Sequence, residues 1–314
     1  MNCEDYTIIR GLPMASLFPE VNVRSAMDYQ PSNSDVIIVS YPKCGTTWTQ
    51  YIVSNIITKG KPPNDPGEFM LHSPFIELFG AESAMNPARR GPIITHLPMN
   101  VFPYTKQAKY IYVTRNPYDC CVSKYHFLKG ITPKAYEDAS FESFVKKFVS
   151  GRLLYGDYFD HLLPWYDQRN EANVLFLTYE QLKADTTQWI FNIAEFLGEE
   201  HIRALMEDDV LLRSVVEAAS LRNMKVVFNY SPHDRVNRML ELPPEKSLKL
   251  AEVFKKAPVT HKETHEGCGY VRKGIVGDWK SHFTQEQIKL MKAWIEKKTK
   301  GSDVMHLWKD IDLP

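Results

Sequence analysis

The sequence predicts an α/β fold, a single domain with a central, mostly parallel sheet flanked by helices. Three observations favour this fold. Short apolar runs of strand length alternate with longer stretches of helical periodicity, as in repeated βαβ units. The chain has 314 residues, enough for one large α/β domain. It also contains no internal repeat or low-complexity tract that would divide it, so we expect residues 1–314 to form one domain.

Four apolar runs are expected to form the sheet: residues 35–40 (DVIIVS), 92–96 (PIITH), 110–115 (YIYVTR) and 173–179 (NVLFLTY). They are bounded by turn residues and rich in β-branched and aromatic side chains, which pack well in strands. The helical stretches between and after them show apolar residues at a spacing of three or four. These predicted helices span residues 47–59, 119–128, 141–151, 155–169, 187–197, 210–219 and 284–298.

A long polar stretch, residues 222–269, interrupts this pattern. It contains four prolines, and only residues 244–256 show a helical periodicity. A stretch of this length without regular structure inside a compact domain is more often a functional lid than a connection. We therefore predict a lid here, which covers a bound substrate and influences which substrate is accepted.

Composition and charge exclude several kinds of partner. Lys and Arg together number 38, as do Asp and Glu, so the formal net charge of +0 gives no cationic surface for nucleic acid. The amino terminus lacks the basic start of a signal peptide, and no apolar run approaches the roughly 18 residues that span a bilayer. The five cysteines form no CxxC pair or zinc-ligand set. We expect a cytoplasmic protein with reduced thiols and no bound metal, nucleic acid or membrane.

The motif YPKCGTTW, residues 41–48, lies between the first predicted strand and the helix after it. Backbone N–H groups converge at such a helix start, and the helix dipole favours an anion there. Gly45 allows close approach of the backbone, and Lys43 adds a positive charge. The motif is not a Walker A loop, in which the lysine follows the second glycine. A plain strand-to-helix turn is the alternative interpretation.

Two further motifs carry the remaining basic residues of interest. RNPYDCCVS, residues 115–123, starts where the third predicted strand ends, the edge at which open α/β sheets bind ligands. Arg115 could hold a phosphate with two hydrogen bonds, although a weak surface pair with Asp119 is the alternative. RKGIVGDWK, residues 272–280, could wrap its cations and glycine backbone around a dianion. A solvated basic turn is the alternative there.

Together, in this order, the three motifs resemble those of the cytosolic sulfotransferase family, YPKxGTTW, RNPxDxxVS and RKGxxGDWKxxF. The resemblance implies an α/β domain with a P-loop-like turn that binds phosphosulfate. It also implies the donor 3′-phosphoadenosine 5′-phosphosulfate (PAPS) and the product adenosine 3′,5′-bisphosphate (PAP). The sulfonate would pass to a hydroxyl or amine of a small acceptor. A sulfonyl group carries less charge than a phosphoryl group, so the transfer requires no metal.

The resemblance also assigns roles to individual residues. His96 would act as general base, and Lys43 would stabilise the leaving phosphate. Trp48 would stack on adenine, although a core aromatic is the alternative, and Tyr179 would lie beside the base. The residues expected to bind the donor are Lys43, Cys44, Gly45, Thr46, Thr47, Trp48, Arg115, Ser123, Tyr179, Ser220, Arg272, Lys273 and Gly274.

The acceptor pocket is predicted from the resemblance as well. Its lining would include Phe75, Leu78, Tyr125, Phe127 and the loop 131–137, each of which could equally be ordinary core. An aromatic lining favours phenols, catecholamine-like amines or steroid alcohols. Two acidic residues, Glu77 and Glu137, could pair with an amine.

The sequence departs from the family pattern in two places. Ile94 replaces a lysine two residues before the catalytic histidine, so more of the charge neutralisation would fall on Lys43. The dimerisation motif would begin at Lys280, but Gln285 and Lys289 replace its valine and glutamate, which weakens the expectation of a homodimer. The alternatives to a cytosolic sulfotransferase are a nucleotide-binding module without catalysis and a P-loop nucleotide kinase. A Golgi-type sulfotransferase is disfavoured because no anchor or signal is visible.

Overall fold

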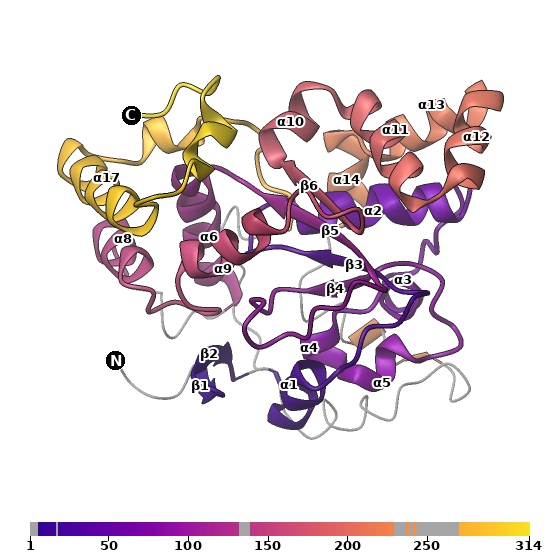
Figure 1. The fold of residues 1–314 in the computed structure, drawn as a ribbon, viewed down its shortest axis with the longest axis horizontal. Helices are drawn as coiled ribbons and strands as arrows, with labels where there is room; N and C mark the ends of the chain where they lie inside the picture. The colour runs from indigo at the N-terminus through magenta and orange to yellow at the C-terminus, as the bar shows by residue number, and fades with distance from the viewer. Residues whose placement is uncertain (1–5, 17, 132–138, 229–236, 239–240, 243–269) are drawn as a thin grey trace.

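A computed structural model describes residues 6–16, 18–131, 139–228, 237–238, 241–242 and 270–314 (Figure 1). Its centre is a four-stranded sheet in the order β4-β3-β5-β6, in which every neighbouring pair is parallel. This confirms the predicted α/β class. The strands are β3 (Val36–Val39), β4 (Ile93–Thr95), β5 (Lys109–Thr114) and β6 (Val174–Thr178), each within or overlapping one predicted run.

Successive side chains of a strand point to opposite faces of the sheet, and helices cover both faces, so both sets of side chains are buried. In β3, Ile37 and Val39 join one hydrophobic cluster, and Ile38 joins the other. Figure 1 shows the helices that supply the two clusters on opposite sides of the sheet. One side carries α6 (Pro117–Ile131), α8 (Phe141–Val149), α9 (Tyr158–Asp167) and α17 (Gln285–Lys298). The other carries α2 (Thr46–Ile57), α10 (Tyr179–Ala184), α11 (Thr186–Leu197), α12 (Glu199–Glu207) and α13 (Asp209–Ala218).

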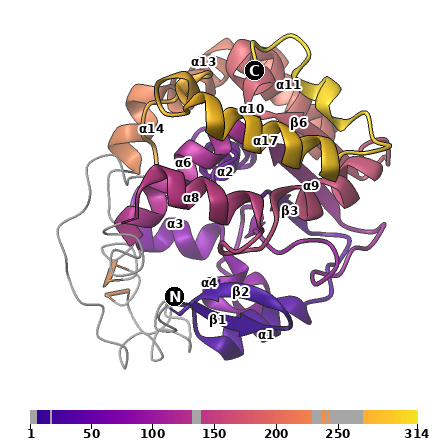
Figure 2. The same ribbon diagram turned by 90° about the vertical axis from the view of Figure 1, so that its left-hand side faces the viewer.

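Several short elements were not predicted. The first is an antiparallel hairpin of β1 (Tyr6–Ile9) and β2 (Leu12–Ala15), which lies beside α1 (Glu20–Met27) in Figure 2. The others are the helices α1, α10, α12, α3 (Pro66–His72), α4 (Ile76–Phe79), α5 (Ala81–Ala84) and α14 (Leu221–Val227), and the 3₁₀ helices η1 (Asp278–Ser281) and η2 (Val304–Trp308). Most of these elements are too short to show a clear period.

Two predicted elements begin at other residues in the structure. The helix expected from residue 155 begins at Tyr158, because Tyr155 and Gly156 adopt left-handed backbone angles, with φ of 68° and 74°. Asp157 then caps the helix by accepting hydrogen bonds from the N–H groups of Phe159 and Asp160. The polar stretch expected from residue 222 instead opens with α14, which Ser220 caps. Most of the predicted lid, including the helix expected at 244–256, lies outside the described residues.

Three cysteines, Cys44, Cys120 and Cys121, are buried free thiols. Across the described ranges, no helix has both the length and the apolar character needed to cross a bilayer. In the segment compared with a dimerisation motif, Lys280 pairs with Asp312, and Thr284 caps α17. The homodimer stays a prediction that gel filtration can test.

Candidate active site

A cavity of about 460 Å³ opens where the strands of the sheet end, within the size range of small-molecule sites. Each strand is followed, directly or within a few residues, by residues that line this cavity. Pro42 and Lys43 come after β3, His96 after β4, Arg115 after β5 and Tyr179 after β6. Ligands of open parallel sheets bind at this edge. The predicted strand ends therefore meet in one cavity.

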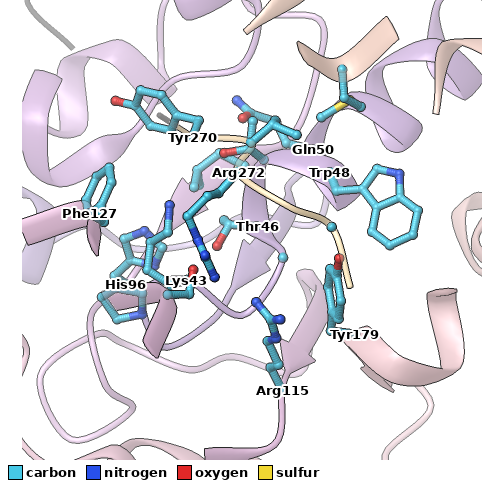
Figure 3. Close-up of a pocket in the computed structure, with 18 of the residues that line it drawn as sticks. Lys43, Thr46, Trp48, Gln50, His96, Arg115, Phe127, Tyr179, Tyr270 and Arg272 are labelled. Atoms are coloured by element: carbon cyan, nitrogen blue, oxygen red, sulfur yellow. The ribbon is translucent and has the colours of Figure 1, made fainter. Parts of the chain in front are cut away.

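Most of the residues singled out from the sequence line this cavity. They are Lys43, Gly45, Thr46, Thr47, Trp48, Phe75, Leu78, His96, Arg115, Ser123, Phe127, Tyr179, Ser220, Arg272, Lys273 and Gly274. Figure 3 shows how they are arranged. His96, Lys43 and Phe127 lie toward one end, Trp48 and Tyr179 toward the other, and the guanidinium groups of Arg115 and Arg272 approach each other between them.

Two residues predicted to line the site, Tyr125 and Cys44, do not line the cavity. The Tyr125 side chain packs against Phe141 and Phe144, and its hydroxyl donates a hydrogen bond to the Ala139 carbonyl oxygen. Tyr125 is thus half-buried against the core and does not line the cavity among the described residues, contrary to the prediction that it lines the acceptor pocket. The Cys44 side chain also points into the core, with its sulfur 3.7 Å from that of Cys120. Glu137 and residues 132–137 of the predicted loop lie outside the described residues.

The 41–48 motif has a backbone that few residue types allow. Lys43 has a φ of 75°, a strained value for a residue with a side chain. Gly45, with a φ of 112°, precedes the first residue of α2, and a Cβ there would lie 3.1 Å from the Tyr179 ring. The Lys43 ammonium lies 4.0 Å from the centre of the Phe127 ring. The loop therefore brings a cation and a helix N-terminus to one place, which suits an anion.

Arg115 and Arg272 offer a second anion site. Arg115 is 7% exposed and donates a hydrogen bond to the Ile275 carbonyl, 2.9 Å away. Arg272 pairs with Asp278. The Nε group of each arginine is buried and, among the described residues, has no hydrogen-bond partner. Two guanidinium groups that approach each other in one cavity fit a bound phosphate, because each can donate hydrogen bonds to its oxygens.

Asp119 joins the second and third motifs. Its carboxylate accepts hydrogen bonds from the backbone N–H groups of Gly277 and Trp279, at 2.8 and 3.0 Å. It also lies 3.7 Å from the Arg115 guanidinium, and both side chains are buried. The alternative of an exposed Arg115–Asp119 pair is therefore wrong. Asp119 fixes Arg115 and the 272–280 segment relative to each other.

The opposite end of the cavity is aromatic. The rings of Trp48 and Tyr179 have centres 5.5 Å apart, and the Arg115 guanidinium lies 4.4 Å from the centre of the Tyr179 ring. The Trp48 indole N–H donates to the Ala219 carbonyl oxygen at 2.8 Å. Trp48 borders the cavity and also packs against the core. Both sequence interpretations of this tryptophan describe part of its position.

His96 is held in one tautomer by its hydrogen bonds. Its Nδ1 lies 2.7 Å from the Ser40 carbonyl oxygen, which can only accept, so we assign the proton to Nδ1. Nε2 is then left with a free lone pair. Burial, together with the charges of Lys124 and Lys43, lowers the pKa of His96 to about 4. The imidazole is therefore neutral at neutral pH, as a general base must be.

Glu77 supports the backbone of His96. Its Oε1 accepts a hydrogen bond from the His96 N–H at 2.6 Å, and His161 Nε2 lies 3.1 Å from the His96 carbonyl oxygen. Glu77 is fully buried, and burial raises its pKa to about 8. The prediction that Glu77 pairs with an acceptor amine is wrong, because this side chain faces the strand end and is absent from the cavity wall.

This burial makes stability depend on pH. The folded state keeps the Glu77 proton up to about pH 8, whereas an unfolded chain releases it above a pKa near 4.5. Ionisation of the unfolded chain therefore favours unfolding as the pH rises between these values. We expect Glu77→Gln, which stays neutral, to raise the melting temperature relative to wild type more at pH 8 than at pH 5. Thermal denaturation at both values checks this, and an equal effect at the two would contradict it.

Sequence reasoning missed several lining residues. Ala15 and Phe18 come from the unpredicted hairpin and the turn after it, and Gln50 and Met70 from α2 and α3. None of them stands in a recognisable motif. Lys124 and Tyr155 are buried near His96, and only Lys124 carries a sequence signal, as a cation directly after Ser123 in an apolar helix. In the part of the chain that is described, no group of three or more metal-ligating side chains occurs.

Comparisons with known proteins agree with this geometry. The family model described as "Sulfotransferase domain" matches residues 33–303. The chain is 32% identical to guinea-pig (Cavia porcellus) 3-alpha-hydroxysteroid sulfotransferase, with 92% of each chain covered. It is 30% identical to rabbit (Oryctolagus cuniculus) amine sulfotransferase, covering 90% of this chain and 86% of the relative. It also resembles the solved structure of mouse sulfotransferase SULT7A1 complexed with PAP, with a TM-score of 0.70, 25% identity and 97% and 98% of the two chains covered.

Proposed function

The chain belongs to the sulfotransferase family, and on that premise we propose that its cavity binds PAPS and transfers the sulfonate to an uncharged alcohol or phenol. One observation supports the site most directly. Lys43, Arg115 and Arg272, which lie far apart in the sequence, line the same cavity as His96. The phosphosulfate would lie against residues 43–47, and the 3′-phosphate between Arg115 and Arg272.

His96 and Lys43 then divide the chemistry. His96 Nε2 accepts the proton of the acceptor hydroxyl while the hydroxyl oxygen forms its bond to sulfur. The bond between sulfur and the bridging phosphate oxygen breaks, and its electron pair stays on that oxygen. Lys43 and the N-terminus of α2 stabilise the charge that develops there. The transfer thus depends on positioning and electrostatics.

The acceptor class follows from the wall near His96. The Phe75 ring lies edge-on to the His96 imidazole, with centres 5.2 Å apart, and Phe18 packs against Phe75. Leu78, Phe79 and Met70 extend this apolar surface. Two ammonium groups, Lys43 and Lys124, act on His96 through their charge. A protonated amine would be repelled by these cations, whereas a phenol or a steroid alcohol would fill the apolar wall.

A transfer assay with labelled donor tests the proposal. The acceptors are a simple phenol, a hydroxysteroid and a primary alkylamine, each measured over a range of concentrations at neutral pH. We expect transfer to the phenol or the steroid, with a higher kcat/KM than to the amine. Tight PAP binding without transfer to any acceptor would contradict catalysis, and preference for the amine would contradict the assigned class.

Arg115 is expected to bind the 3′-phosphate, so its removal weakens binding of PAP. Hydrogen bonds to charged groups contribute about 1.5–3 kcal/mol, which corresponds to a loss of affinity of about 10- to 100-fold for Arg115→Ala. Arg115→Lys keeps the charge but loses the planar pair of donors, and we expect an intermediate loss. Calorimetric titration with PAP measures both, with the exposed Arg213→Ala as control. Unchanged affinity in Arg115→Ala would contradict the assignment.

A further inference from the structure

Lys124 is a buried cation in the wall of the catalytic cavity. It follows Ser123 in α6, its residue is 1% exposed, and its side chain borders the cavity. Its ammonium group donates hydrogen bonds to the Tyr41 hydroxyl at 2.5 Å and to the Leu154 carbonyl oxygen at 2.8 Å. An ammonium group has three N–H donors, so one N–H remains to donate a hydrogen bond to a ligand.

Lys124 has no carboxylate partner to match its charge among the described residues. The thiols of Cys44 and Cys121 lie near it, and burial raises the pKa of both well above the usual value, which keeps them neutral. Asp157 acts on Lys124 from a distance but already pairs with Lys298 and accepts from the Trp294 indole. A buried ammonium whose hydrogen-bond partners are neutral lacks a counter-ion, which is unfavourable. The site therefore gains stability when an anion enters.

The position of Lys124 along the cavity shows which anion it can meet. Lys124 donates to the carbonyl oxygen of Leu154, and the ring of the next residue, Tyr155, lies 5.4 Å from the His96 imidazole, centre to centre. Figure 3 shows Lys43 beside His96 as well, so both lysines lie at the His96 end of the cavity. Arg115 and Arg272 lie farther toward the aromatic end (Figure 3). The acceptor hydroxyl gives its proton to the imidazole while its oxygen attacks the sulfur, so the imidazole must lie near the sulfur. Lys124 is thus at the sulfonate end of the cavity.

We propose that Lys124 is a second catalytic cation, which contacts the transferring sulfonate and shares with Lys43 the neutralisation of its charge. The proposal rests on the proposed function. It also explains the departure at Ile94, where the family pattern has a lysine. Ile94 lines the cavity but supplies no charge, and Lys124 reaches the same end from a different element.

The protonation of Lys124 provides a readout that a structural role would not give. Burial lowers its pKa to about 7, so the free protein at pH 8 holds mostly the neutral amine. An incoming anion favours the ammonium, so binding of PAPS at pH 8 would take up nearly one proton. The titratable groups that interact with Lys124 are Tyr41, Cys44, Cys120, Cys121, Asp157, His96 and His161. The comparison of wild type with Lys124→Met isolates the proton that belongs to Lys124.

The test is calorimetric titration with PAPS at pH 8 in two buffers of different ionisation enthalpy, without acceptor. We expect wild type and the control Lys129→Met, which lies on the same helix outside the cavity, to take up nearly one proton. We expect Lys124→Met to take up none. No uptake by wild type, or the same uptake by Lys124→Met, would overturn the proposal. Because no transfer is measured, this result is independent of whether an acceptor is found.

Turnover gives a second measurement. Loss of one preorganised group that stabilises developing charge costs about 10²- to 10³-fold in kcat, so we expect a loss of this order for Lys124→Met at pH 7. The affinity for PAP, which has no sulfonate, should stay within about threefold of wild type and also reports that the variant is folded. Transfer at the wild-type rate would reject the role of Lys124 while leaving the proposed function intact. Equal losses of transfer and PAP affinity would show a structural role instead.

Discussion

Replacing His96 with alanine is expected to lower the rate of sulfonate transfer by about 10²- to 10⁴-fold, the usual contribution of a general base. The imidazole lies beside Lys43 and packs against the Phe75 ring, with Nε2 free to accept a proton. Its removal leaves the groups expected to bind the nucleotide in place. We therefore expect the affinity for PAP to stay within about threefold of wild type, so the loss falls on kcat.

The matched control is His306→Ala, which removes an exposed imidazole on η2 and should leave the transfer rate unchanged. Steady-state assays with labelled donor and calorimetry with PAP measure the two effects separately. A second readout is the pH profile of kcat/KM, which reports the free enzyme. Because the base acts only when deprotonated and its pKa is about 4, activity should be lost on the acid side near pH 4 and not near pH 6.5. Wild-type turnover by His96→Ala would remove His96 from the mechanism.

Replacing Lys43 with methionine is expected to reduce kcat by about 10²- to 10³-fold, because the leaving oxygen loses the cation that stabilises its charge. The affinity for PAP should fall less, since Arg115, Arg272 and the α2 N-terminus, which we propose as its phosphate-binding groups, remain in place. Lys43 has a φ of 75°, so a substitution could also act through the backbone. Methionine retains a side chain at this strained position and thereby isolates the effect of the charge.

The chain offers a control for the backbone as well. Lys59, just after α2, has a φ of 52° and is exposed outside the cavity. Lys59→Met should therefore leave both kcat and PAP affinity unchanged. If Lys43→Met lost PAP affinity as strongly as it lost turnover, Lys43 would be a binding residue without a special role in the transition state.

The strands and their site residues could be predicted because the signal is local. A buried parallel strand is a continuous apolar run, and the residue after it lies at the ligand-binding edge of the sheet. His96, Arg115 and Tyr179 directly follow their strands and Lys43 stands in the motif after β3, and the structure brings all four to one cavity. The three motifs added Arg272, whose position depends on the hydrogen bonds that Asp119 accepts.

What the sequence could not give depends on contacts between distant segments. Tyr125 and Phe127 are two aromatic residues of the same helix and look alike in sequence. The contacts of Tyr125 with Phe141 and Phe144, which the sequence does not show, direct its ring away from the cavity. Glu77 looks like an exposed acid in sequence, yet its helix α4 buries it against the backbone of His96. Tyr155 adopts a left-handed backbone conformation, which Gly, Asn and Asp favour and which a tyrosine in the sequence does not predict.

A crystal structure with bound PAP tests the central claim most directly, since it locates both phosphates. The account predicts the 5′-phosphate against the backbone of residues 43–47 and the 3′-phosphate within hydrogen-bond distance of Arg115 and Arg272. His96 should then lie beside the 5′-phosphate. PAP bound with its 3′-phosphate away from both arginines, or with the 5′-phosphate far from His96, would contradict the account.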